Sequence, residues 1–178
     1  QAFMQQLVVL IVALCFSWSS WVSAQEDASY LLGPGDKITI QVIGEPELTI
    51  ETQLTDSGKI NYPFLGEITA KGLTIKKLED VVYNGLKGDY FVEPNVFVGI
   101  VEYRPFFIHG EVKQPGGYPY KPGMTVNQAV ALAGGMTERA SREKIFITRE
   151  ASKNKQETAN LNTSVKPGDT VTIEQRFF

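Results

Sequence analysis

The chain has 178 residues, of which 43% are hydrophobic and 21% are charged, with 16 Gly and 9 Pro. These values are typical of a globular protein and exclude a disordered, collagen-like or polytopic membrane chain. Lys and Arg total 17 against 20 acidic residues, and a formal net charge of -3 does not favour nucleic-acid binding, which needs a clustered basic excess.

The N-terminal segment is typical of a secretory signal peptide. Residues 7–16 read LVVLIVALCF, and a small-x-small sequence, Val22-Ser23-Ala24, precedes Gln25. This order predicts cleavage before Gln25. The alternative is an uncleaved membrane anchor, because Trp18 and Trp21 extend the apolar run toward the about 20 residues that a membrane span needs.

Cys15 is the only cysteine and lies inside this apolar run. A bacterial lipoprotein site needs a small residue before its Cys, whereas Leu14 is bulky. We therefore interpret Cys15 as part of the signal peptide and not as a lipidated residue. A mature chain without it has no thiol, which suits an oxidising compartment.

Pro-Gly turns recur along the rest of the chain, at residues 33–36, 166–169 and, more loosely, 121–124. The first two end in Asp and lead into alternating apolar and polar residues, which predicts half-buried strands at 37–42 and 171–173. Pro presets the first turn angle, Gly takes the positive φ, and Asp caps exposed backbone amides. We interpret these copies as one turn-then-strand unit used in two β-rich modules.

Two strand segments and a helix are predicted after the first strand. Residues 53–63 read as a β-hairpin with Asp56-Ser57-Gly58 at its turn, and residues 64–68 as a short strand. Thr74 is the expected N-cap of a helix running to about Lys87, because apolar residues recur along one side. These residues are Ile75, Leu78, Val82 and Leu86.

The boundary between the modules is expected at Arg104-Pro105. Before it, residues 96–101 are apolar enough to form a strand buried on both faces. After it, Thr125 and Gln128 have the spacing of a capping box, which predicts a second helix ending at Gly134-Gly135. The apolar stripe of this helix comprises Val126, Ala129, Val130 and Ala133. Strands are expected at 106–108 and 145–148, a turn-rich segment at 114–119 and a polar loop at 153–157.

These elements predict an α+β fold of two small β-rich modules, each with one main helix. Their motifs resemble those of the outer-membrane polysaccharide export family (Wza type). The resemblance covers residues 30–173 and implies three parts: a signal peptide (1–24), a polysaccharide export domain (25–103) and an SLBB β-grasp domain (104–178). The motifs are the segments 30–36, 56–60, 62–66, 72–74 and 94–96, then 110–118, 123–125 and 131–135.

The resemblance implies a periplasmic channel component associated with the outer membrane of a Gram-negative cell envelope. Family members form ring-shaped homo-oligomers that pass capsular or exopolysaccharide outward and work with an inner-membrane polysaccharide copolymerase. The full-length type adds a second β-grasp domain and a C-terminal membrane helix. Because this sequence stops at Arg176-Phe177-Phe178, we expect a short form whose ring docks to another membrane component or sits against the bilayer without crossing it. Lateral contacts are expected at β-edges and at residues 103–107.

Catalysis and cofactor binding are not expected. A single Cys excludes a Cys-based zinc cluster. A single His does not favour a His-dependent metal centre or proton relay, and we expect His109 to be structural or on the surface. The carboxylates at Glu45, Glu47, Glu51 and Asp56 show no spacing that would fix an acid/base pair, which a glycosidase holds about 5 to 10 Å apart. We therefore predict no catalytic, cofactor-binding or metal-binding residue.

Aromatic residues offer apolar faces that could stack on sugars, although most are expected in cores or subunit interfaces. A second hypothesis for the chain is a soluble periplasmic β-grasp module that binds a small ligand or the end of a glycan. Oligomer mass distinguishes the two, because a binding module can act as a monomer. The aromatic residues in question are Tyr62, Phe64, Tyr83, Tyr90, Phe91, Tyr103, Tyr118 and Tyr120.

Overall fold

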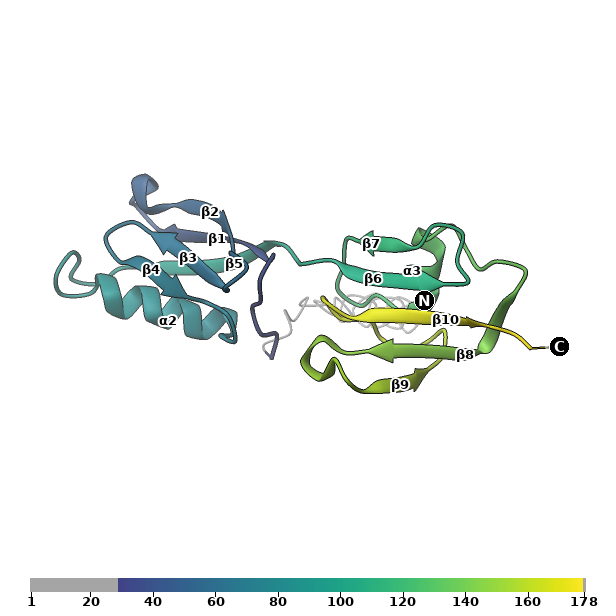
Figure 1. Ribbon diagram of the computed structural model, residues 1–178. Coiled ribbons are helices and arrows are strands. Elements are labelled where there is room, and N and C mark those ends of the chain that lie inside the picture. Colours follow the sequence, from purple (N-terminus) through teal and green to yellow (C-terminus); the bar gives the residue numbers. More distant parts are fainter. Residues whose placement is uncertain (1–28, 178) are drawn as a thin grey trace, which may run out of the picture.

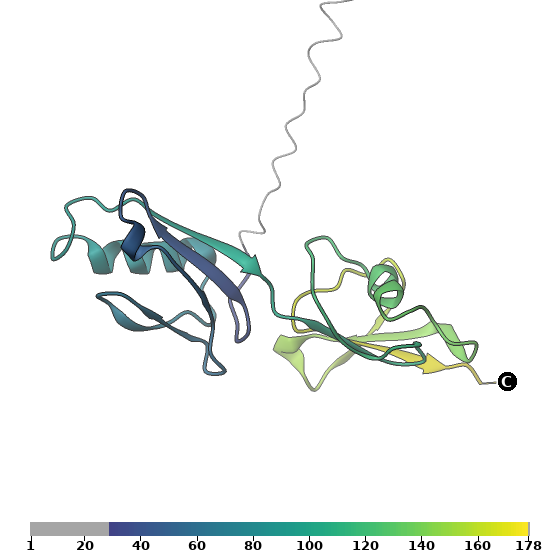
Figure 2. The same cartoon turned by 90° about the horizontal axis from the view of Figure 1, so that it is seen from above.

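The computed structural model describes residues 29–177, so the predictions for the signal peptide and for Cys15 lie outside the described residues. Two β-rich bodies lie end to end and are joined by one crossing of the chain after β5 (Figures 1 and 2). The described residues contain sheets of three, two and five strands together with two α-helices. The predicted α+β fold is confirmed.

The first module contains a three-stranded antiparallel sheet in the order β2-β1-β5. Its strands are β1 (Lys37–Val42), β2 (Ile50–Gln53) and β5 (Val96–Glu102), and a short 3-10 helix, η1 (Pro46–Leu48), joins β1 to β2. The strand predicted at 37–42 is present with the expected alternation, because every second side chain of β1 is buried. These buried residues are Ile38, Ile40 and Val42.

The predicted hairpin over residues 53–63 is wrong. β2 pairs with β1, whereas β3 (Lys59–Tyr62) pairs with β4 (Gly66–Thr69), so the turn at Asp56-Ser57-Gly58 connects two different sheets. The chain reverses instead at Pro63-Phe64-Leu65, where Phe64 has φ 66 and Gly66 has φ 69. Pairing with β1 commits β2 to the other sheet and leaves β3 to pair with the next segment.

Helix α2 (Ile75–Leu86) covers one face of the first module, as Figure 1 shows. The Thr74 hydroxyl accepts a hydrogen bond from the Lys77 amide at 3.2 Å, which confirms the predicted N-cap. The predicted apolar side faces the core. Leu78, Val82 and Leu86 are fully buried there, and Ile75 packs at the edge.

Strand β5 is not buried on both faces as predicted. Val98 packs in the core with α2, but Phe97 and Val101 on the other face remain 48% and 46% exposed. Side chains alternate along a strand, and the apolar core of this module lies on one face of β5 only. The uninterrupted apolar run therefore reflects one core face and one exposed apolar face.

The second module is a mixed five-stranded sheet, crossed by helix α3 (Figure 2), with the strand order β7-β6-β10-β8-β9. β6 and β10 are parallel, and the other neighbours are antiparallel. The second core lies between the sheet and α3. The elements are β6 (Phe106–Gly110), β7 (Gly116–Tyr118), α3 (Val126–Leu132), β8 (Ala140–Thr148), η2 (Glu150–Ser152), β9 (Gln156–Ala159) and β10 (Thr170–Gln175).

Two edge strands replace segments that the sequence predicted as turn or loop. β7 falls within residues 114–119 and pairs with β6, and β9 begins in the predicted polar loop and pairs with β8. Both lie at sheet edges, where glycines and polar residues give no apolar periodicity. The loose Pro-Gly turn at 121–124 opens helix α3 and not a strand.

Helix α3 begins and ends as predicted. The Thr125 amide donates to the Gln128 side chain at 3.0 Å, which satisfies an amide at the start of the helix. Gly134 and Gly135 have φ 81 and φ 92, the left-handed conformation that favours glycine after a helix. The predicted apolar stripe of Val126, Ala129, Val130 and Ala133 is buried in the second core.

Candidate functional site at the module junction

Asp36 closes the first Pro-Gly-Asp turn with a fully buried carboxylate. The Gly33 amide donates to Asp36 Oδ2 at 2.9 Å, and the Tyr30 hydroxyl donates to both carboxylate oxygens at 2.8 and 2.9 Å. The predicted role of this Asp as a cap for backbone amides is confirmed. Buried carboxylates need such donors, because removal from water costs several kcal/mol.

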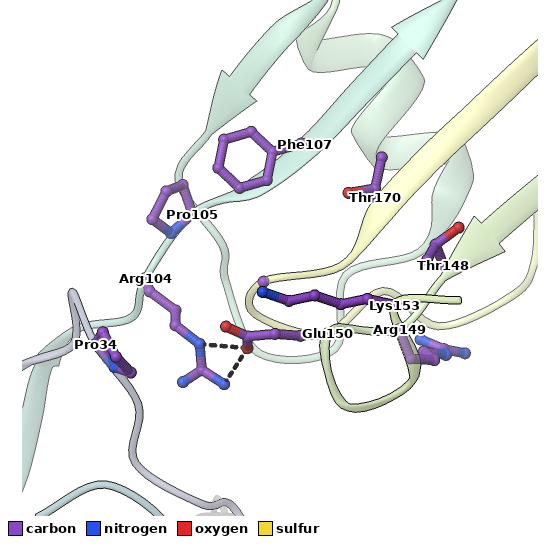
Figure 3. Close-up of a pocket in the computed structure, with 10 residues that line it drawn as sticks. Pro34, Arg104, Pro105, Phe107, Thr148, Arg149, Glu150, Lys153 and Thr170 are labelled. Atoms are coloured by element: carbon purple, nitrogen blue, oxygen red, sulfur yellow. Dashed lines mark hydrogen bonds and ion pairs between the residues drawn. The ribbon is translucent and has the colours of Figure 1, made fainter. Parts of the chain in front are cut away.

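Arg104 joins this turn to the second module. Its main-chain amide donates to Asp36 Oδ1 at 2.7 Å, and its guanidinium Nη1 donates to Asp36 Oδ2 at 2.8 Å. The same guanidinium binds Glu150 Oε2 through Nε at 2.8 Å and through Nη2 at 2.7 Å (Figure 3). One carboxylate from each module therefore binds one cation, whose side chain is only 14% exposed.

Electrostatics keep the groups at this junction in the forms that bind each other. Burial of Arg104 acts to lower its pKa, but the charge of Asp36 and the hydrogen bond to Glu150 outweigh burial, so the pKa is raised. Burial raises the pKa of the Tyr30 hydroxyl, and the Asp36 carboxylate raises it further. Arg104 stays charged and Tyr30 stays protonated, and the Tyr30 hydroxyl also contacts the Arg104 guanidinium.

The second module contains the same arrangement, in which a buried Asp at the end of a Pro-Gly turn binds an arginine and a backbone amide. Asp169 is buried, and its Oδ2 accepts hydrogen bonds from the Lys166 amide at 2.7 Å and from Arg149 Nη1 at 2.5 Å. Burial raises the pKa of Asp169, an effect that the Lys166 amide and Arg149 oppose in part. Each Pro-Gly-Asp turn thus has an arginine partner. Sequence reasoning missed both arginines, because they lie 68 and 20 residues from their aspartates.

Three tyrosines line the junction. Tyr103 lies between Tyr30 and Tyr120, with ring centroids 5.1 and 5.3 Å apart and both pairs in edge-to-face geometry. Residues 103–107 were predicted to make contacts between subunits. Within one chain the half-buried Tyr103 packs against two other tyrosines, and Phe107 at the other end of this segment is exposed, so the contact between subunits stays a prediction.

A pocket of about 400 Å³ opens beside Arg104. Its residues come from the first turn, the crossing segment, the adjoining ends of β6, β8 and β10, and the η2 segment that follows β8 (Figure 3). It is lined by Pro34, Arg104, Pro105, Phe107, Thr148, Arg149, Glu150, Lys153, Gly168 and Thr170. Sequence reasoning singled out Arg104-Pro105 as a boundary but gave no signal for a pocket there.

The four carboxylates considered as acid/base candidates do not converge. Glu51 forms an ion pair with Lys37 at 2.6 Å, Asp56 lies in the turn before β3, and Glu45 and Glu47 flank the start of η1. His109 is exposed, as predicted, with its Nε2 3.1 Å from the Thr172 hydroxyl oxygen. Within residues 29–177 there is no group of three His, Cys, Asp or Glu side chains that could hold a metal ion.

Most of the aromatic residues considered for sugar contact pack inside the chain. Tyr62 is buried and donates to the Leu48 carbonyl at 2.9 Å, and Tyr118 packs on the second core. Phe64 and Tyr90 are exposed and lie against each other with centroids 4.9 Å apart. The sequence prediction did not include Phe107 among the aromatic residues that could contact a sugar. The signal that could have identified it is a large apolar residue at a solvent-facing position of a strand.

Among residues 29–177, no helix has both the length and the apolar character needed to cross a membrane.

Both modules match models of known protein families. Residues 24–101 match the model of polysaccharide biosynthesis/export proteins, and residues 105–158 match the SLBB domain. The chain belongs to the polysaccharide biosynthesis/export family. The resemblance predicted from the sequence motifs is confirmed, and Arg104 lies between the two matched segments.

Curated relatives are similar along most of the chain. The exopolysaccharide production protein ExoF of Rhizobium meliloti (strain 1021) is 31% identical over 82% of this chain and 38% of its own length. The EPS I polysaccharide export outer membrane protein EpsA of Ralstonia nicotianae is 28% identical over 83% and 48%. The polysialic acid transport protein KpsD of Escherichia coli is 27% identical over 67% and 22%. The chain thus spans less than half the length of these relatives.

Proposed function

We propose that the chain is a non-enzymatic component of a ring that exports capsular or exopolysaccharide across the cell envelope. The observation that carries this proposal is the ordered pair of family matches, an export domain followed by an SLBB domain. Relatives named for exopolysaccharide production, EPS export and polysialic acid transport support it. The proposed location is the periplasm, in association with the outer membrane.

The proposed domain division is 25–103 for export and 104–178 for the SLBB β-grasp domain, with 1–24 removed as a signal peptide. Two separate hydrophobic cores support this division. The strands of the two modules belong to different sheets, and the chain crosses between them at Arg104-Pro105. Each domain would therefore contribute one layer to an assembly.

The ring is proposed because neither module, over residues 29–177, encloses a passage. The core of each is filled by its own side chains, so a lumen for a polymer must form between subunits. Identical subunits close a ring through two different surfaces on each copy. The edge strands β2, β5, β7 and β9 and the exposed pair Phe64 and Tyr90 offer such surfaces. An inner-membrane polysaccharide copolymerase is the proposed partner.

The absence of enzymatic activity is proposed from the chemistry of the described residues. In residues 29–177, the buried aspartates Asp36 and Asp169 are bound to arginines and backbone amides. A carboxylate held in this way stabilises a turn and has no open position beside it for a reacting group. The function follows from shape and assembly, with energy supplied by partners.

The experiment combines export and assembly. Deletion of the gene should abolish secreted polysaccharide in the producing strain, and the wild-type gene should restore it. Electron microscopy of the purified protein, in detergent and after co-expression with its copolymerase, should show rings with a central opening. Undiminished secretion after deletion, or monomers under both conditions, would overturn the export proposal and favour a soluble binding module.

A further inference from the structure

The five-stranded sheet has one buried face and one open face. Thr170 on β10 lies opposite Phe107 on β6 and Thr148 on β8, so the three residues form a row across adjacent strands. Their strand neighbours Phe106, Val171 and Ile147 are buried in the second core. Because side chains alternate along a strand, the row of one aromatic ring and two hydroxyls lies on the open face.

The Phe107 ring packs against Gly117 on the neighbouring strand. It pairs with Gly117 on β7, and a Cβ atom at position 117 would lie 3.0 Å from Phe107 Cε1 and 3.2 Å from Cδ1. A side chain at position 117 would therefore require the Phe107 ring to shift by a few tenths of an ångström. Gly117 lets the ring lie across the neighbouring strand while 47% of the Phe107 residue stays exposed.

The first module and the loop after β8 supply the walls of the pocket. Pro105 lies beside Phe107, Pro34 lies beside Arg104, and the Glu150 carboxylate and the Lys153 side chain lie on the side away from Phe107 (Figure 3). Gly168 permits this approach of Glu150, because its φ is +80 and a Cβ there would lie 2.2 Å from Glu150 Oε2. The ion pair between Arg104 and Glu150 then holds the Glu150 side of the pocket next to the crossing segment.

Charge in and behind the pocket is balanced. Arg104, Arg149 and Lys153 carry three positive charges. Three carboxylates match them, those of Asp36, Glu150 and Asp169, and the two arginines are already paired with these carboxylates. The balance disfavours a phosphate or another strongly charged ligand. What the pocket offers is a flat apolar ring, two proline surfaces, two hydroxyls, a carboxylate and the Lys153 ammonium group.

We propose that this pocket binds one neutral pyranose unit of a glycan. Phe107 stacks on the C–H face of the sugar ring, while Thr148, Thr170 and Glu150 bind its hydroxyl groups. A volume of about 400 Å³ lies within the range of small-molecule sites. This inference rests on the proposed export function and adds a defined contact between the SLBB module and the polymer.

The test is an NMR titration of the 15N-labelled chain from Gln25 to Phe178. The probe is a set of short oligosaccharides released by partial hydrolysis of the producing strain's own exopolysaccharide, at millimolar concentration. Amide shifts should change at Phe107, Thr148 and Thr170. Phe107→Ala should weaken binding by about five- to tenfold, from the loss of aromatic stacking, whereas Phe107→Trp should retain it.

Phe97 is the matched control. It is 48% exposed on the open face of the first sheet and lies over Gly99, yet it lines no part of the pocket. Phe97→Ala should leave binding unchanged, and thermal melting should show that all three variants are folded. Equal affinity of Phe107→Ala and the wild type would overturn the proposal. So would loss of binding when carboxyl groups of the oligosaccharides are reduced.

Export assays separate this inference from the proposed function. If the wild-type chain restores secretion and forms rings but no oligosaccharide shifts the pocket amides, the subsite is wrong and the export function stands. If deletion leaves secretion intact while the oligosaccharides bind through Phe107, the export function is wrong and the subsite stands.

Discussion

Arg104 binds Asp36 twice, through its main-chain amide at 2.7 Å and through its guanidinium at 2.8 Å. The first contact fixes the path of the backbone where it leaves β5, and the second fixes the side chain. Because the same guanidinium reaches Glu150 in the second module, the local geometry of one residue sets how the two modules meet.

Arg104→Met should destabilise the protein by about 3 kcal/mol, because it leaves the fully buried Asp36 carboxylate without its cation. Urea unfolding followed by circular dichroism measures the change. Arg142, an exposed residue on β8, gives the matched control, and Arg142→Met should shift the midpoint little. Equal midpoints for the two variants would show that the Arg104–Asp36 pair contributes nothing.

Glu150→Gln should change the arrangement of the modules more than their stability. Glu150 is 36% exposed, so its ion pair contributes at most about 1 kcal/mol. Loss of that pair removes one of the polar contacts between the modules. Small-angle X-ray scattering should show a broader distribution of distances than for Glu143→Gln, an exposed substitution on β8. Identical scattering curves would argue against Glu150 as a fixing contact.

Tyr30→Phe should make stability less sensitive to alkaline pH. Burial, and then Asp36, raises the pKa of Tyr30 above its ordinary value, so above about pH 10 the unfolded chain ionises this group first. The stability that the neutral hydroxyl contributes is present below pH 10 and falls as pH rises. At neutral pH, loss of the hydrogen bonds to Asp36 should cost about 1 kcal/mol.

The measurement for Tyr30 is urea unfolding at intervals between pH 8 and pH 11. Subtracting the Tyr30→Phe curve from the wild-type curve removes contributions from other titrating groups. A difference that stays constant across this range would contradict the raised pKa of Tyr30.

Gly135→Val should destabilise the second module by about 1 kcal/mol or more, because φ 92 is strained for a β-branched residue. No atom lies within 4 Å of the position of an added Cβ, so the cost comes from the backbone alone. Gly135→Asn is the control, since Asn tolerates this conformation better and should lose less. Thermal melting compares them, and equal losses would point to a cause other than φ.

Local signals in the sequence predicted the parts of the fold that depend on local contacts. The caps at Thr74 and Thr125, the glycines after α3 and the alternation in β1 each depend on residues within a few positions. The pairing of β3 with β4 was not predictable in this way. It depends on β2, the strand before β3, pairing with β1 in the other sheet. The sequence did not predict that one face of β5 is exposed, because the residues on both faces of this strand are apolar.

The junction shows the same division. Asp36 was identified as a turn cap from its own neighbours, whereas Arg104 was identified only as a boundary. Its partners lie far away in the sequence, and only folding brings Glu150 and Tyr30 to it. Phe107 was overlooked for a similar reason, since its place in a row with Thr170 depends on the pairing of β6 with β10, a strand more than 60 residues away.

In the proposed ring, the Arg104–Glu150 ion pair would occur once in every subunit around the symmetry axis. Rotational symmetry imposes the same angle between modules on every copy, so a small tilt at one salt bridge is reproduced in each subunit at once. The layer of export domains and the layer of SLBB domains in such a ring would then change diameter together. A contact between two side chains would in this way set the diameter of an assembly many times larger than either module.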